Sequence, residues 1–153
     1  MAWILSLLTN PFLITSISSW FVAQVIKTVI YAFLNKKLDL RWMYSDGGMP
    51  SGHSATISSL AMYSALACGP ASFECAVTLV LAIIICHDAS GVRQETGKQT
   101  LLLEEFLKAF EELGKDDFPE VKLKRFVGHT PIQVLAGVTV GIANALLMYF
   151  LVF

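Results

Sequence analysis

Residues 11–34 read PFLITSISSWFVAQVIKTVIYAFL, an apolar stretch of 24 residues in which Lys27 is the single charge. A helix needs about 20 such residues to cross the roughly 30 Å hydrocarbon core of a bilayer. The whole chain has the same character, because 55% of its 153 residues are hydrophobic and only 15% are charged. That balance lies outside the range of ordinary soluble domains. The sequence therefore predicts an all-α integral membrane protein.

Three further apolar stretches follow, at about residues 50–68, 71–86 and 130–153. The breaker pair Gly69-Pro70 separates the first two and predicts a tight turn between helices. These two stretches are short, so a pair of partly inserted helices is the alternative to two full spans. We predict a helical bundle of about four transmembrane helices that forms one domain over residues 1–153. Residues 1–8 lack a basic segment and predict an interfacial lead-in, not a cleaved signal peptide.

Positive charges set the expected orientation. Ten of the eleven Lys and Arg residues fall in the loop between the first and second stretches or in the loop between the third and fourth. Four spans place these two loops on the same side, which by the positive-inside rule is the cytoplasm. We therefore expect a bacterial-type inner (plasma) membrane protein with its charged loops inside. The net charge of −1 argues against nucleic acid as a partner.

The long loop predicts an amphipathic helix over about residues 97–114. Its apolar residues recur at spacings of three and four, and Glu and Lys residues occupy the other face. The helix is expected to pack on the bundle or lie in the membrane interface, and a regulatory or partner-binding role is the alternative. Cys68, Cys75 and Cys86 have no C-x-x-C spacing and are interpreted as small apolar packing residues. A disulfide between Cys68 and Cys75 across the outer turn is conceivable.

All three histidines lie at the expected cytoplasmic ends of the helices. His53 begins the second span, His87 ends the third and His129 begins the fourth. His87 is interpreted as a helix-end residue bonded to the backbone. Unpaired ionisable groups at membrane depth are costly, so such groups indicate a functional site. The pocket predicted at this membrane face also collects the charged residues nearby in sequence: Arg41, Asp46, Asp88, Arg93 and Lys98.

The stretch GGMPSGHSAT, residues 47–56, suits phosphoryl transfer. A glycine-rich loop that ends at a helix N-terminus can aim main-chain N–H groups and the Ser51 hydroxyl at phosphate oxygens. Arg and Lys side chains would neutralise the remaining charge. Of two histidines, one can attack phosphorus as neutral imidazole while the other donates a proton to the leaving oxygen. This chemistry requires no metal and no cofactor.

Three blocks of the sequence carry a resemblance to a known family. PSGH (residues 50–53) and GHTPIQVLAG (residues 128–137) resemble the second and third signature motifs of the type-2 phosphatidic acid phosphatase and vanadium haloperoxidase superfamily. Together with DASGVRQETGKQ (residues 88–99), they resemble its divergent small-membrane-protein branch, the acid phosphatase and vanadium-dependent haloperoxidase related proteins. The three blocks occur in order over nearly the whole chain, which makes the resemblance specific.

The resemblance implies roles for individual residues. His129 would be the nucleophile that becomes a phosphohistidine, His53 the general acid, and Ser51 and Gly52 phosphate-binding residues. The superfamily has an aspartate four residues after its nucleophile, where this chain has Gln133. Gln133 can accept a hydrogen bond from the ring N–H but cannot stabilise an imidazolium by charge. We therefore expect slow catalysis, or a carboxylate partner supplied by Asp88 or Asp46.

The basic residues of the superfamily are incomplete in this chain. The third-motif arginine would stand six residues before His129, where Leu123 is found, and the first motif is absent. We expect Arg93 to supply the missing charge, followed by Lys27, with Arg41 and Lys98 as further candidates. The alternative for Lys27 is snorkelling to the membrane surface.

The sequence thus predicts a membrane phosphatase acting on a phosphate or diphosphate monoester of a lipid or polyprenol. The alternative is a non-catalytic membrane protein that binds, carries or senses a phosphorylated ligand. Haloperoxidase activity ranks third, because the haloperoxidase relatives are soluble. Gly137, Gly141 and Ala145 form a small-residue face for helix packing within or between chains. A homodimer is predicted, because the superfamily commonly uses about six spans and four leave the pocket incompletely walled.

Overall fold

The computed structural model describes residues 2–44, 47–112 and 129–152, and every regular element in these ranges is helical. Three helices are long and apolar enough to cross a membrane: α2 (Pro11–Asn35), α4 (Phe73–Ser90), and α6 (Pro131–Leu147) with its π-helical extension η2 (Met148–Val152). Helix α3 (Gly52–Cys68) has 17 residues. Its length of about 25 Å falls short of a hydrocarbon core of about 30 Å. The all-α membrane class is confirmed, with three candidate spans.

Side-chain caps define where the apolar helices begin. The Asn10 side chain accepts a hydrogen bond from Phe12 N–H (2.9 Å) at the start of α2. Ser51, Ser72 and Thr130 do the same for α3, α4 and α6. Because these caps satisfy N–H groups that the helix itself leaves without partners, the helices begin within about two residues of the predicted apolar stretches.

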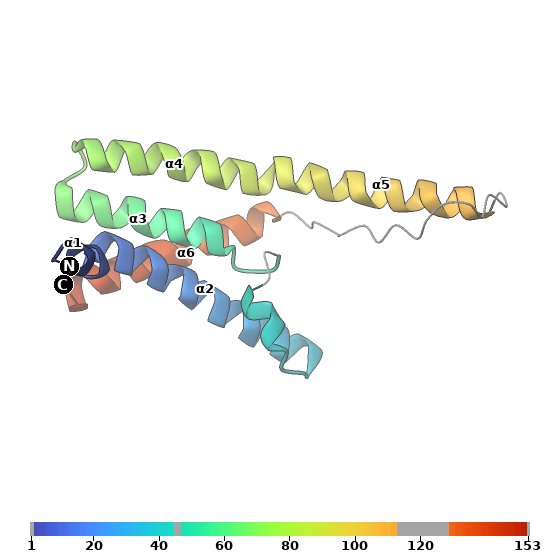
Figure 1. Ribbon diagram of the computed structural model, residues 1–153, viewed down its shortest axis with the longest axis horizontal. Coiled ribbons are helices and arrows are strands. Elements are labelled where there is room, and N and C mark those ends of the chain that lie inside the picture. The colour runs from blue at the N-terminus through green and yellow to red at the C-terminus, as the bar shows by residue number, and fades with distance from the viewer. Residues whose placement is uncertain (1, 45–46, 113–128, 153) are drawn as a thin grey trace.

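Helix α3 lies at the centre of the bundle (Figure 1), and α2, α4 and α6 all pack against it. Helices α2 and α6 also pack against each other, whereas α4 and α6 touch much less. Two shorter helices, α1 (Ala2–Leu8) and η1 (Leu40–Tyr44), adjoin α2. The first and last helices lie at one end of the bundle and α5 (Val92–Glu112) extends from the other.

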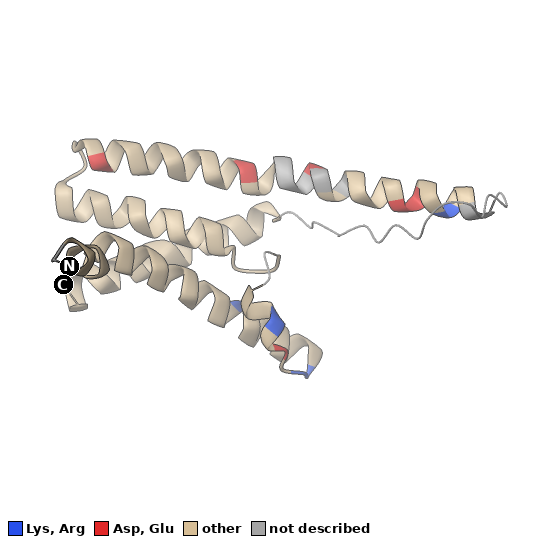
Figure 2. Ribbon diagram, in the orientation of Figure 1, with Lys and Arg blue, Asp and Glu red and all other residues tan. Residues whose placement is uncertain are grey.

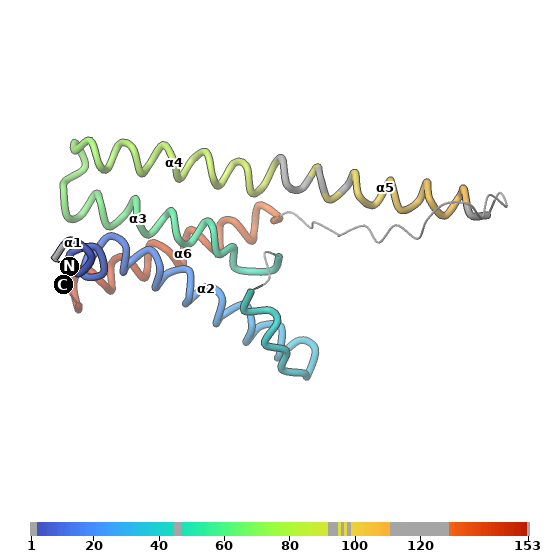
Figure 3. The backbone as a smooth tube through the Cα atoms, viewed as in Figure 1, coloured from blue at the N-terminus to red at the C-terminus, as the bar shows by residue number. Residues whose placement is uncertain are grey.

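Helix α4 continues almost straight into α5 (Figure 3). The only interruption is at Gly91, whose N–H still bonds to the His87 carbonyl (2.9 Å), and the Gly91 carbonyl accepts from Glu95 N–H (3.1 Å). Helix α4 thus extends past Cys86, where the third apolar stretch ends, and α5 begins at Val92, earlier than the predicted start at about residue 97. Helical hydrogen bonding continues through the polar residues between them, because a change from apolar to polar composition does not end a helix. Most of the described side chains on α5, among them Leu102, Phe106 and Phe110, are exposed.

The outside of the bundle is more apolar than its inside. Phe33, Phe73 and Leu151 are 86%, 79% and 78% exposed. The buried positions are largely small or polar, including Ser19, Ser54, Ser59 and Ala55. This inverted pattern is expected where lipid surrounds the helices, because close packing of small residues then holds them together. Charged residues gather at the end from which α5 extends (Figure 2), and Glu74 lies in the first turn of α4 at the other end.

The small-residue face of α6 is used inside the chain. A Cβ atom at Gly137 would overlap the Ser51 carbonyl oxygen, and one at Gly141 would overlap the Ala55 carbonyl oxygen. The α6 backbone therefore rests directly on α3. The homodimer stays a prediction, but this face is not the surface that could form it.

Asn144 joins α6 to α2 near the end of the bundle opposite α5. Its Nδ2 donates to Ser19 Oγ (2.8 Å), Ser18 Oγ (3.0 Å) and the Thr15 carbonyl (3.2 Å). We expect Asn144→Ala to lower the free energy of unfolding in detergent by about 1 kcal/mol, the scale of interhelical hydrogen bonds in membranes. The control is Thr139→Ala, because the Thr139 hydroxyl bonds only within α6, to Leu135. Equal losses in the two variants would contradict a role for Asn144 between the helices.

Candidate active site

His129 lies directly before α6 and is only 2% exposed. Its main-chain N–H donates to the Ala89 carbonyl at the end of α4 (3.2 Å). Its ring Nδ1 lies 3.3 Å from Gln133 Oε1. The end of α4 thus holds the main chain of His129, and the first turn of α6 holds its imidazole.

Gln133 determines which ring nitrogen of neutral His129 carries the proton. Its Oε1 accepts the Thr130 N–H (3.1 Å), and its own N–H donates to Thr130 Oγ1 (3.4 Å), which forms a capping box. An N–H can bond only to an acceptor, so the amide atom facing Thr130 is the oxygen. The same oxygen then accepts from His129 Nδ1–H. In this tautomer the lone pair resides on Nε2.

The loop before α3 is tied to this first turn of α6. The Ser51 N–H donates to the Gln133 carbonyl (3.0 Å). The Ser51 Oγ accepts from Ser54 N–H (3.4 Å) and Ser54 Oγ (3.0 Å), and the Ser51 side chain is fully buried. The N–H of Ser51 is therefore committed to α6 and its hydroxyl caps α3. Its role in phosphate binding stays a prediction, as does that of the buried Gly52.

Lys27 is buried beside the glycine turn. Its side chain is 2% exposed, so the alternative of snorkelling is wrong. Its Cγ lies 3.3 Å from where a Cβ of Gly48 would stand, and Gly48 has φ +94°, a conformation that favours glycine. A Cβ there would also stand 3.4 Å from a ring carbon of Trp42, so a side chain at this position would fit tightly between Trp42 and the Lys27 stem. The fold thus places a buried cation against the turn that resembles a phosphate loop.

Gln24 was not among the predicted site residues, and it lies three residues before Lys27 on the same buried face of α2. Gln24 is 4% exposed, and its Nε2 lies 3.7 Å from where a Cβ of Gly52 would stand. Within the described residues, its Oε1 has no hydrogen-bond partner. A buried acceptor without a partner is costly. The signal available in the sequence was a polar residue one turn from the only charge in an apolar helix.

His53 lies on a different side of α3. Its neighbours Ser51 and Ser54 face α6, where a Cβ at Gly137 would meet them. His53 itself is exposed and lines a pocket together with Trp20 of α2 and Ile85 of α4. His53 therefore lies on a side of α3 other than the side that packs on α6, the helix that begins just after His129.

The remaining candidates are dispersed or lie outside the described residues. Arg41 is exposed on η1, with its N–H bonded to Asp39 Oδ1 (3.0 Å). Asp88 is half-buried in the last turn of α4, next to Ala89. Asp46 and the side chains of Arg93 and Lys98 lie outside what the structure describes. In the described ranges, no group of three or more His, Cys, Asp or Glu residues is placed to hold a metal ion.

Comparison with known proteins places these residues in a family context. The family model described as "Divergent PAP2 family" matches residues 8–144. The uncharacterized membrane protein YuiD of Bacillus subtilis (strain 168) is 37% identical over 155 residues, covering 95% of this chain and 98% of its own length. No solved structure matches the chain. The resemblance inferred from the three sequence blocks is thereby confirmed.

Proposed function

The chain belongs to the divergent PAP2 family, and we propose that it is a metal-independent membrane phosphatase that cleaves a phosphate or diphosphate monoester of a lipid or polyprenol. His129 would be the nucleophile and His53 the general acid. A phosphatase-related role fits the family.

The observation that carries the proposal is the hydrogen bond between His129 Nδ1 and Gln133 Oε1 (3.3 Å). It favours the tautomer whose Nε2 lone pair can attack phosphorus. In the first step a bond forms between Nε2 and phosphorus, the bond from phosphorus to the leaving oxygen breaks, and His53 protonates that oxygen. In the second step water attacks phosphorus, the N–P bond breaks and releases phosphate, and the proton from water returns to His53.

Lys27 is the cation best placed for the charge on phosphate. Its buried stem packs over Gly48, next to the loop that leads into α3. A Lys ammonium beside this turn can neutralise charge on a bound phosphate. Gln24 lies on the same face of α2, and its side-chain amide would hydrogen-bond to the ligand or to the attacking water. We rank Lys27 above Arg93, whose place in the site stays a prediction.

The proposed membrane topology has α3 as a fourth span. The helix is short, but α2, α4 and α6 pack around it. Much of its surface therefore contacts protein rather than lipid. The charged end of the bundle (Figure 2) would then face the cytoplasm, with the active site there. Helix α5, which continues almost straight from α4, would then project from this face of the membrane.

The direct test is phosphate release by the purified protein in nanodiscs, with alkyl and polyprenyl phosphates as substrates. We expect hydrolysis without added metal and in the presence of chelator. Absence of release from every ester, by protein shown to be folded, would overturn the proposed activity.

Gln133→Glu is expected to raise turnover. Glutamate has the same length, so its carboxylate can still accept from Thr130 N–H and His129 Nδ1–H. Its charge would stabilise the cationic imidazole that forms during attack. Exchanging a carboxylate for an amide at the comparable position of a protease triad costs about 10⁴ in rate, which sets the upper limit of the gain. The acidic limb of the rate profile should also move to higher pH, because a neighbouring negative charge favours protonated imidazole.

The control for this variant is Gln133→Leu, which removes both the cap and the acceptor and should lower turnover. Rates are measured as kcat/KM against pH, together with thermal unfolding. A Gln133→Glu protein with the parent's rate and pH profile would show that Gln133 does not orient the nucleophile.

A non-catalytic phosphate-binding role is the second candidate, and the amide at Gln133 is the observation that favours it. Vanadate separates the two. An enzyme should bind this transition-state mimic far more tightly than phosphate, whereas a receptor gains nothing from the transition-state geometry. Similar affinities for vanadate and phosphate would favour the receptor.

A further inference from the structure

The pocket that contains His53 lies on the side of α3 away from α6. It has a volume of about 370 Å³, within the range of small-molecule sites, and is lined by Ile17, Trp20, His53, Thr56, Ile57 and Ile85. Helices α2 and α4 contribute its two walls. Both pack on α3, and the pocket occupies the space between them.

Among the described residues that line this pocket, His53 is the one ionisable group. The Thr56 hydroxyl donates to the Gly52 carbonyl within its own helix (2.8 Å), so its polarity is already satisfied. Ile17 is 63% exposed at the rim. Because α2 and α4 are candidate membrane spans, a rim between them would face the hydrocarbon of a bilayer, and a hydrocarbon chain could enter from the side.

His53 stands at the polar end of the pocket. It is in the first turn of α3, at the end of the bundle where the charged residues gather. Ile57 lies one turn after His53 on α3. Ile17 lies about one turn before Trp20 on α2, away from the charged end of the bundle. Trp20 sits close to Gly52, with its Cδ1 3.2 Å from where a Cβ of Gly52 would stand. The pocket therefore offers a proton donor at one end and apolar walls along its depth.

We propose that this pocket binds the leaving group of the substrate, an alcohol that carries a linear hydrocarbon chain. The inference rests on the proposed function. A general acid must lie within hydrogen-bond reach of the oxygen that it protonates. That oxygen is bonded to the first carbon of the leaving alcohol, so the chain has to begin at His53. This pocket is the space that continues from His53. The hydrocarbon chain would therefore lie between α2 and α4.

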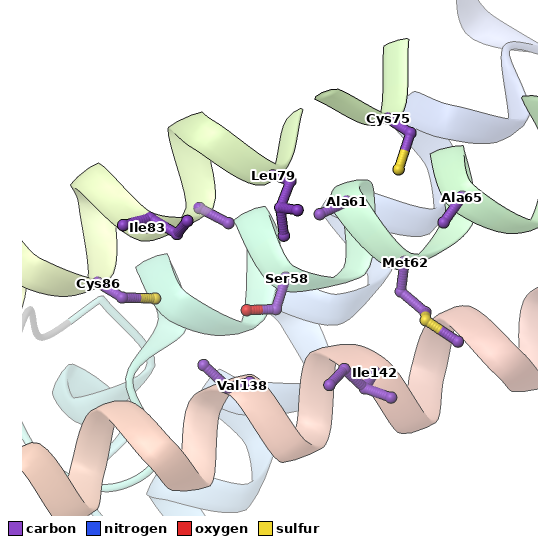
Figure 4. A pocket seen from close by; sticks show the side chains of 11 residues that line it. Ser58, Ala61, Met62, Ala65, Cys75, Leu79, Ile83, Cys86, Val138 and Ile142 are labelled. Atoms are coloured by element: carbon purple, nitrogen blue, oxygen red, sulfur yellow. The ribbon is translucent and has the colours of Figure 1, made fainter. Parts of the chain in front are cut away.

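A second groove provides a matched control. It lies between α4 and α6 with α3 as its floor (Figure 4) and has a volume of about 380 Å³. None of the described residues that line it is ionisable except cysteine. Ile142 lines it on α6 and is 37% exposed. The groove is as large as the His53 pocket and faces the same bilayer, so a chain that simply sought apolar space would use either one.

The test compares dodecyl phosphate with butyl phosphate in nanodiscs. The measured quantity is the ratio of the two kcat/KM values, in which partitioning of each ester into the bilayer is the same for all variants. We expect Ile85→Trp to lower the dodecyl-to-butyl ratio at least tenfold. The larger side chain would block the pocket for the long chain and displace its phosphate, and a displacement of about 1 Å can cost about 10²-fold in rate. Ile142→Trp should keep the parent ratio. Ile17→Trp, at the exposed rim, repeats the test if Ile85→Trp does not fold.

A labelling arm separates failure of this inference from failure of the proposed function. Dodecyl phosphate with a diazirine at its chain end should label α2 and α4 around Ile17 and Ile85, in competition with unmodified dodecyl phosphate. Labelling around Val138 and Ile142 instead, or an effect of Ile142→Trp on the ratio, would overturn the inference. If the parent hydrolyses neither ester, the proposed function fails while the labelling still decides whether the chain binds here.

Discussion

Replacing His129 with alanine is expected to reduce turnover of every phosphate ester by on the order of 10⁴-fold or more, since removing a protease nucleophile costs about 10⁶. The described residues around it suggest no substitute, because Gln133 and Thr130 carry an amide and a hydroxyl that the capping box already engages. Substrate binding should change much less than turnover, because the nucleophile acts mainly in the transition state.

The control for this variant is His87→Ala. His87 is exposed in the last turn of α4, and its described hydrogen bonds are made by its main-chain carbonyl, to Gly91 N–H and Ser90 Oγ. Its loss should leave turnover within about twofold, as for most surface substitutions. Hydrolysis by His129→Ala at the parent rate would show that the chemistry is carried out elsewhere.

Gly141→Leu is expected to destabilise the bundle by about 3 kcal/mol or more, at or above the upper end of the usual cost of overpacking. Any side chain there would overlap the Ala55 carbonyl oxygen and lie 3.0 Å from Ser59 N. Both neighbours are main-chain atoms of α3, so a rotamer change cannot relieve the overlap and α6 must move away.

Ala143→Leu is the matched control, because residue 143 is exposed on the outer face of the same helix. Thermal unfolding and size-exclusion chromatography in detergent compare the two variants. Equal stability of Gly141→Leu and Ala143→Leu would contradict the direct backbone contact between α3 and α6.

The sequence predicted the helices well because each one is a long apolar stretch with a cap at its start. Residues 11–34 correspond closely to α2, and the stretch that ends at Cys68 corresponds to α3. The structure differs from the prediction at the junction of α4 and α5, where helical hydrogen bonding continues into a polar stretch. Hydrophobicity indicates where lipid contact stops, whereas helical hydrogen bonding continues until the backbone finds another partner.

The contents of the site were predicted in part. The placement of His129 and Gln133 on one turn followed from their spacing of four residues. The side of α3 to which His53 belongs did not, because it depends on how three helices pack around α3. Burial of Lys27 and Gln24 could not be predicted either. When a membrane helix carries apolar residues on all of its faces, the pattern of hydrophobicity does not indicate which face points into the bundle.

The central claim is that His129 becomes covalently phosphorylated, and trapping that intermediate tests it most directly. Protein in nanodiscs is mixed with a ³²P-labelled lipid phosphate, quenched with alkali within milliseconds to seconds, digested and analysed by mass spectrometry. We expect an acid-labile, alkali-stable phosphoryl group on His129 and none in His129→Ala. In His53→Ala the phosphoenzyme should accumulate if the substrate has a leaving group acidic enough to depart without protonation. A protein that turns over while its phosphoryl group sits on another residue, or while no phosphoenzyme forms, would contradict the account.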